Sequence, residues 1–91
     1  MLLQSLAKLI VTPGTNSTNI IPLSKIKISP AMLSHPPKPY KIAQRYTYYL
    51  HNQQFQSPII LDQNYNLLDG YITYLIAKMM GHKTVTVKFA K

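Results

Sequence analysis

Apolar residues recur with two different periods along the chain, and each change of period marks a predicted element. In the run TVTVKF near the C-terminus, Val85 and Val87 alternate with polar residues, which is the pattern of a half-buried strand. Between Gly70 and Gly81 the period is helical, and the apolar stripe consists of Ile72, Leu75, Ile76, Met79 and Met80. Gly81 is expected to supply the left-handed residue that ends this helix.

A second helix is predicted over 40–53, in the run YKIAQRYTYYLHNQ. Its expected buried stripe follows the i, i+4, i+7, i+8 spacing of one helix face and consists of Ile42, Tyr46, Tyr49 and Leu50. Pro39 suits the first turn of this helix, because a proline there loses no helical hydrogen bond. The four prolines of SPAMLSHPPKP exclude regular structure immediately before it.

Further strands are expected on either side of this helix. SPIILD and YNLLD predict a hairpin with its turn at 62–65, where Asn64 is the residue that tolerates a positive φ. The segment IIPLSKIKIS at 20–29 places Ile26 and Ile28 on one face and lysines on the other. This alternation predicts a half-buried strand.

The order strand, helix, hairpin, helix, strand predicts an α+β domain over 20–91, with a small mixed β-sheet and two main helices. Residues 1–19 precede it as an apolar segment, expected to form a short N-terminal helix, and the linker TPGTNSTN. The predicted core of the domain consists of Ile26, Ile28, Ile42, Tyr46, Leu50, Ile59, Leu61, Leu68, Leu75, Ile76, Met79, Val85 and Val87.

Charge is the most informative feature of the composition. Ten Lys and Arg residues face two acids, which gives a net charge of +8 and predicts attraction to polyanions, with DNA favoured over RNA. One face of the second predicted helix carries basic residues with a tyrosine, a pattern that suits a phosphate backbone and a stacked base. The predicted nucleic-acid-binding residues are Lys25, Lys27, Lys38, Lys41, Arg45 and Tyr48. The alternative is an ordinary solvated helix face.

Several classes of function have no support in the composition. The chain has no cysteine, which excludes disulfides and thiolate chemistry. No apolar run approaches the ~20 residues of a membrane span, and no signal peptide is recognisable, so we expect a cytoplasmic protein that does not contact membranes. Asp62, Asp69 and three scattered histidines show no metal-ligand spacing. We therefore expect a non-enzyme without metal or cofactor, with a nuclease as the alternative.

The run PIILDQNYNLLDGYITYLIAKMMGHKTVTV, together with the order of elements, resembles the ParB N-terminal domain and the sulfiredoxin-like superfamily. The resemblance spans about 20–89. Within the superfamily, the chain is most similar to short stand-alone ParB-like proteins. The positions that carry it are Pro58, Ile59, Leu61, Leu68, Asp69, Gly70, Ala77, Gly81, Val85 and Val87. It implies the fold of that superfamily.

The resemblance also directs attention to the turn at Gly70. Partition ParB proteins place Glu-Arg-Arg after this glycine to bind nucleotide phosphates, whereas sulfiredoxins place Cys-His-Arg there with a nucleophilic cysteine. The same positions are Tyr71, Ile72 and Thr73 in this chain. Sulfiredoxin chemistry is therefore excluded, and a nucleotide switch of the partition type is not expected.

The turn could still bind an anion through its backbone. Helix-start N–H groups attract anions, and the residues concerned are Asp69, Gly70, Tyr71 and Thr73. The preferred interpretation is that the Asp69 carboxylate caps the helix and accepts those N–H groups itself.

Two functions from different classes follow. The first is a small non-catalytic nucleic-acid-binding module with little sequence specificity. The second is a ParB-like domain that has lost its ligand and binds a protein partner or a second copy of itself. Seven tyrosines suit a protein interface as well as a base-stacking surface.

Overall fold

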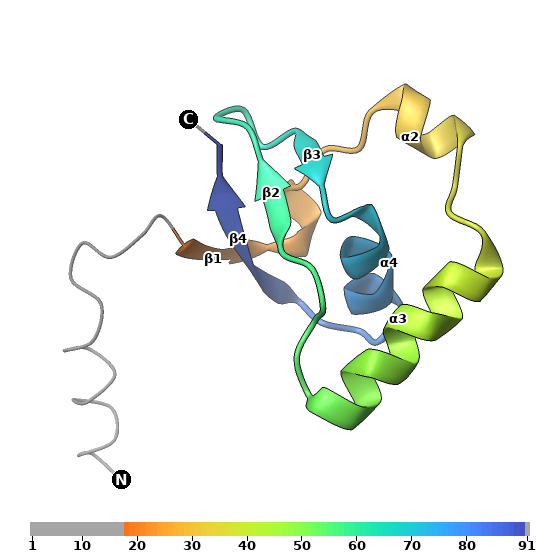
Figure 1. Ribbon diagram of the computed structural model, residues 1–91. Helices are drawn as coiled ribbons and strands as arrows, with labels where there is room; N and C mark the ends of the chain where they lie inside the picture. Colours follow the sequence, from red (N-terminus) through yellow and green to blue (C-terminus); the bar gives the residue numbers. More distant parts are fainter. Residues whose placement is uncertain (1–17, 91) are drawn as a thin grey trace, which may run out of the picture.

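The computed structural model describes residues 18–90, which form a four-stranded mixed sheet in the order β1-β4-β2-β3. The strands are β1 (Thr18–Pro22), β2 (Ile59–Leu61), β3 (Leu67–Asp69) and β4 (Thr84–Phe89). β2 runs parallel to β4, and the other two pairs are antiparallel. The predicted α+β class with a mixed sheet is confirmed (Figure 1). The expected N-terminal helix and most of the linker lie in 1–17, outside the described residues.

Both main helices form where the sequence predicts them. They are α3 (Pro39–Asn52) and α4 (Tyr71–Met79). At the end of α4, Gly81 has a φ of 80°, and its N–H donates to the Lys78 carbonyl at 3.1 Å. The next N–H, of His82, donates to the Ala77 carbonyl at 3.0 Å, which completes the Schellman motif. The expected glycine cap is therefore confirmed.

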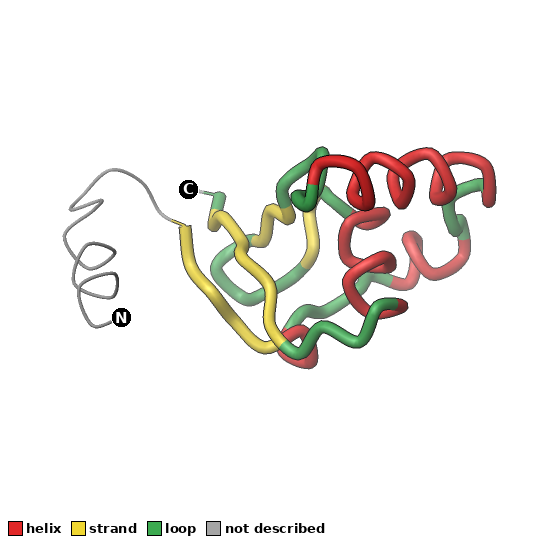
Figure 2. Tube along the Cα trace, turned by 90° about the horizontal axis from the view of Figure 1, so that it is seen from below, coloured by secondary structure: helices red, strands yellow, loops and turns green. Residues whose placement is uncertain are grey.

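The helices gather on one side of the sheet, as Figure 2 shows. α4 packs against β2, and α3 packs against α4. No helix of the described region is long and apolar enough to cross a bilayer.

The prediction for the first strand is wrong in its position. The strand β1 ends at Pro22, and the 3-10 helix η1 (Leu23–Lys25) follows, so 23–29 do not form the regular strand expected. The Leu23 N–H still donates to the Lys83 carbonyl at 2.9 Å, and the chain then turns into η1. Beyond η1, Lys27 forms only an isolated bridge with Asn66. Ile26 is still buried, because the chain turns back onto the core there.

The proline-rich stretch also contains a short helix that the sequence analysis did not expect, α2 (Pro30–Ser34). The hydroxyl oxygen of Ser29 accepts a hydrogen bond from the Met32 N–H at 3.1 Å and caps the helix. Pro30 is the first helical residue, where a missing N–H costs nothing. A proline cluster therefore excludes a helix interior but permits a helix start.

Part of the predicted core is correct. Ile59, Leu61, Ile76 and Val87 are almost completely buried, and Ile26 and Val85 join them. Ile28, Ile42, Tyr46 and Leu75 are only partly buried. Leu50, Leu68 and Met79 are wrong, with exposed fractions of 53%, 49% and 61%. The buried residues that the prediction omitted are Ile21, Leu23, Leu67, Thr73 and Ala77.

The errors at Leu68 and Leu50 have separate causes. The hairpin register shifts between Ile60 and Leu61, which turns Leu67 inward and Leu68 outward, since neighbouring strand residues face opposite sides. In addition, α3 packs mainly against α4, and none of its residues is fully buried.

The hairpin turn is organised by Asp62. Its carboxylate accepts hydrogen bonds from the N–H groups of Asn64 and Asn66 at 2.8 and 2.9 Å. The side-chain hydrogen bond from Asn66 is the main cause that lowers the pKa of Asp62 below its usual value. The residue with positive φ is Tyr65, at 70°, and not Asn64 as predicted.

We expect Ile76→Ala to lower the free energy of unfolding by about 2–5 kcal/mol, because Ile76 is 1% exposed and a cavity would remain. Leu75→Ala, at a half-buried position one residue earlier, should cause a smaller loss. Urea denaturation followed by circular dichroism measures both. Equal losses would contradict the description of Ile76 as more deeply buried than Leu75.

Candidate functional site

The turn before α4 brings two backbone segments into close approach. Gly70 is buried and has a φ of 90°. A Cβ atom there would overlap the Pro58 carbonyl oxygen and lie 2.8 Å from the Ile59 Cα. Glycine is therefore required at this position for two reasons: the φ is positive, and there is no room for a Cβ atom.

The polar groups of this turn are used within the fold. Asp69 Oδ1 accepts the Gly70 N–H at 2.8 Å, and the N-cap of α4 is Gly70 itself. The expected capping of α4 by Asp69 is thus wrong, because the carboxylate binds the N–H just before the helix. The hydroxyl of Thr73 is buried and donates to the Ser57 carbonyl at 2.9 Å. Tyr71 is half-buried and stacks on Tyr74 with ring centroids 6.4 Å apart. Anion binding at this turn stays a prediction.

The predicted basic residues of α3 lie along one helix. Lys38, its N-cap, and Lys41 are exposed, whereas Arg45 and Tyr48 are half-buried. The Nη1 of Arg45 donates to the Ser57 hydroxyl at 2.9 Å. The first turn of α3 contains no acidic residue, and no side chain caps it. Two lysines therefore stand at the electropositive end of the helix.

The structure does not group Lys25 and Lys27 with these α3 residues. Both line a hollow of about 420 Å³ beside the hairpin turn, with Asn64 and Tyr65. The Nζ of Lys25 lies 5.5 Å from the centre of the Tyr65 ring. In Figure 1 this hairpin turn and α3 lie at opposite ends of the domain. The predicted nucleic-acid-binding residues therefore do not form one continuous basic patch, and whether Lys25 and Lys27 bind nucleic acid stays a prediction.

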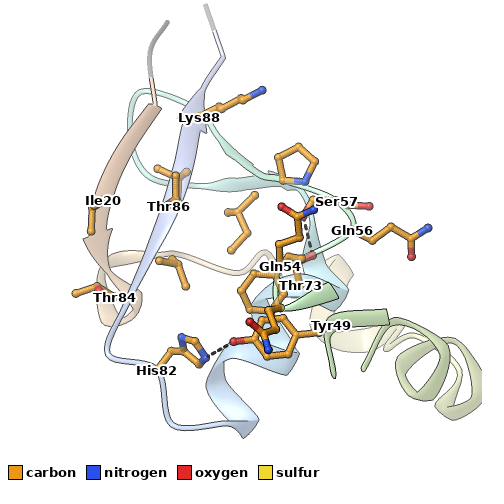
Figure 3. A pocket seen from close by; sticks show the side chains of 16 residues that line it. Ile20, Tyr49, Gln54, Gln56, Ser57, Thr73, His82, Thr84, Thr86 and Lys88 are labelled. Carbon is orange, nitrogen blue, oxygen red and sulfur yellow. Dashed lines mark hydrogen bonds between the residues drawn. The ribbon is translucent and has the colours of Figure 1, made fainter. Parts of the chain in front are cut away.

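A larger groove, which the sequence analysis missed, lies between β4 and the segment 53–58 (Figure 3). Its volume is about 650 Å³. Tyr49 and Phe55 stack in it with ring centroids 4.6 Å apart, and the His82 ring lies edge-on to Tyr49 at 6.1 Å. The Tyr49 hydroxyl is 3.5 Å from His82 Nε2. An aromatic cluster of this kind can bind a planar, apolar-faced ligand.

Polar groups surround this aromatic cluster. Three glutamines of the 53–58 segment, Gln53, Gln54 and Gln56, are exposed on one wall. Thr84, Thr86 and Lys88 of β4 form the opposite wall. One local signal could have indicated the groove: the run NQQFQS places a single aromatic residue among amides in a loop.

Comparison with solved structures identifies the fold. A pNOB8-like ParB N-domain has a TM-score of 0.67 and 25% identity, over 87% of this chain and 31% of that chain. Sulfiredoxin from Arabidopsis thaliana has a TM-score of 0.67 and 22% identity, over 81% and 84% of the two chains. The C-terminally truncated partitioning protein ParB from Caulobacter crescentus, complexed with CTP-γ-S, has a TM-score of 0.62 and 14% identity. It matches 81% of this chain and 44% of its own.

The described domain therefore has a ParB/sulfiredoxin-like fold. The chain spans less than a third of the pNOB8-like ParB chain but most of the sulfiredoxin chain. A scan of the sequence against family models and a search of curated proteins find no match.

We expect Gly70→Ala to lower the free energy of unfolding by about 2–4 kcal/mol, since it combines strained φ with overlap at Pro58. Gly81→Ala is the matched control, because Gly81 has φ of 80° but nothing within 4 Å of the added Cβ. It should cost only about 1–2 kcal/mol. Thermal and urea denaturation measure both variants, and equal costs would contradict the role given to the Pro58 contact.

Proposed function

We propose that this chain is a small, non-catalytic nucleic-acid-binding module that holds the phosphate backbone through the basic face of α3, with little sequence specificity. The observation that carries the proposal is the N-terminal end of α3, where Lys38 and Lys41 are exposed and no acid or capping side chain is present.

Lysines at a helix N-terminus are electrostatically unfavourable in the free protein. The helix dipole places about half a positive charge there, and Lys38 and Lys41 add two more charges of the same sign. A phosphate bound at this end would interact favourably with all of them. The arrangement therefore suits a protein whose α3 is in contact with an anion when it functions.

The two acidic residues make their hydrogen bonds away from α3. Asp62 is occupied by Asn64 and Asn66 in the hairpin turn, and Asp69 by the Gly70 N–H. The chain carries a net charge of +8, which attracts polyanions in general, and DNA is the partner we favour over RNA. The likeness to ParB N-domains supports a ParB-like domain with nucleic-acid or protein partners.

A protein-interaction module is the second candidate. Leu50 on α3 and Met79 on α4 expose 53% and 61% of their surface, and α3 packs against α4. Exposed apolar side chains on packed helices suit a partner protein or a second copy of this chain.

The non-catalytic part of the proposal rests on the available functional groups. The hydroxyl of Thr73 and the carboxylate of Asp69 are both used in internal hydrogen bonds. Within 18–90, histidine and acidic side chains form no group of three that could hold a metal ion.

We expect Lys38→Ala/Lys41→Ala to flatten the slope of log affinity against log salt on duplex DNA by about two, if each lysine contacts one phosphate. Fluorescence anisotropy over a salt series gives the slope. The double variant Lys25→Ala/Lys27→Ala removes the same charge at the hairpin and is the control. An equal effect of the two variants would show that binding reflects total charge and not α3.

We also expect weak or no CTP or ATP binding in calorimetry at millimolar nucleotide. Tyr71, Ile72 and Thr73 supply no cation at the turn before α4, and the Thr73 hydroxyl is bonded to Ser57. Micromolar affinity for either nucleotide would show that the backbone of the turn is sufficient for binding.

A further inference from the structure

The groove between β4 and the 53–58 segment combines aromatic, amide and cationic groups. The stacked rings of Tyr49 and Phe55 present an aromatic surface within it, next to exposed glutamines. His82 and Lys88 lie at opposite ends of the groove in Figure 3. Its volume of about 650 Å³ is within the ~300–1,000 Å³ that small-ligand pockets usually have.

One wall of the groove is the first part of β4, which has no strand partner on the β2 side. β2 pairs with β4 only from Val87 onward, whereas β1 pairs with β4 from Thr84. The Leu23 N–H donates to the Lys83 carbonyl on the β1 side at 2.9 Å, and the Ala90 N–H donates to Leu61 on the β2 side at 2.7 Å. Because hydrogen bonding alternates along a strand, the backbone groups of Thr84 face the groove and not β1.

The basic face of α3 leads directly into this groove. Lys41, Arg45 and Tyr49 are spaced four residues apart and therefore share one side of α3. Arg45 binds the hydroxyl of Ser57, and both Ser57 and Tyr49 line the groove. A strand whose phosphates lie along α3 would consequently bring its bases to the groove.

We infer that the groove binds an unpaired base of single-stranded nucleic acid, stacked on the Tyr49–Phe55 pair, while the phosphates contact α3. This inference rests on the nucleic-acid function proposed above. Stacking accepts every base, because each has a π face, and amide and backbone groups can hydrogen-bond to the edges of the base. A duplex keeps its bases paired and stacked, so it can use α3 but not the groove.

The test compares three fluorescent probes of equal length on the wild-type chain: an ordinary single strand, a single strand in which abasic sites replace the central bases, and a duplex. We expect the ordinary strand to bind roughly 5- to 150-fold more tightly than the abasic strand, the range expected for one stacked base. The two single strands should show the same salt slope, since their phosphates are identical.

Phe55→Leu should remove most of this preference while leaving the affinity for the duplex unchanged. Leucine keeps apolar contact with the core, against which Phe55 packs, but offers no ring for stacking. Tyr40→Leu is the matched control, because Tyr40 is 57% exposed on α3 and lies outside the groove. It should keep the preference in full, and circular dichroism confirms that both variants are folded.

Two results would overturn the inference, and they differ from a failure of the proposed function. If the wild type binds the ordinary and abasic strands equally, or if Phe55→Leu keeps the full preference, no base is held in the groove, although nucleic-acid binding itself stands. If none of the three probes binds even at low salt, the proposed function fails, and this inference fails with it.

Discussion

The glycine at position 70 allows the turn before α4 to approach the Pro58 carbonyl closely, at the place where α3, α4 and β2 meet. Around this contact, the Thr73 hydroxyl binds the Ser57 carbonyl and the Arg45 guanidinium binds the Ser57 hydroxyl. α3, α4 and the start of β2 are therefore fixed at a single junction. Only glycine, whose side chain is a hydrogen atom, leaves room for this arrangement. Packing alone is therefore enough to explain the glycine at position 70.

The groove lies beside the same junction, because Ser57, Pro58 and Thr73 line it. The ladder between β2 and β4 begins only at Ile59, the residue after the Pro58 carbonyl that Gly70 approaches. The residues before Pro58 diverge from β4, and the half of β4 that starts at Thr84 is left with a strand partner on the β1 side alone. Pro58, which Gly70 approaches, thus also lines the candidate binding site.

The features that the sequence predicted are those with a local physical cause. α3, α4 and β4 follow from periodicity, and the Gly81 cap follows from the conformational freedom of glycine. The features that it missed depend on distant contacts. The inward residue of β3 is decided by a register shift against β2, and the groove joins Tyr49, Phe55 and His82, which have no common spacing along the chain. The periodicity of a sequence does not indicate which residues from different elements will contact one another.

The position of charge gives the strongest physical link between fold and proposed function. At the turn before α4, the three residues after Gly70 are uncharged, so that turn offers an anion only backbone groups. Lys41 and Arg45 lie instead on α3, and Arg45 binds Ser57, the residue preceding the proline that approaches Gly70. The hydrogen bond between Arg45 and Ser57 thus keeps α3 next to the groove, which Ser57 lines. A ligand that spans both must carry anionic groups at one end and a flat, uncharged group at the other, and a nucleotide unit of a single strand has this chemistry.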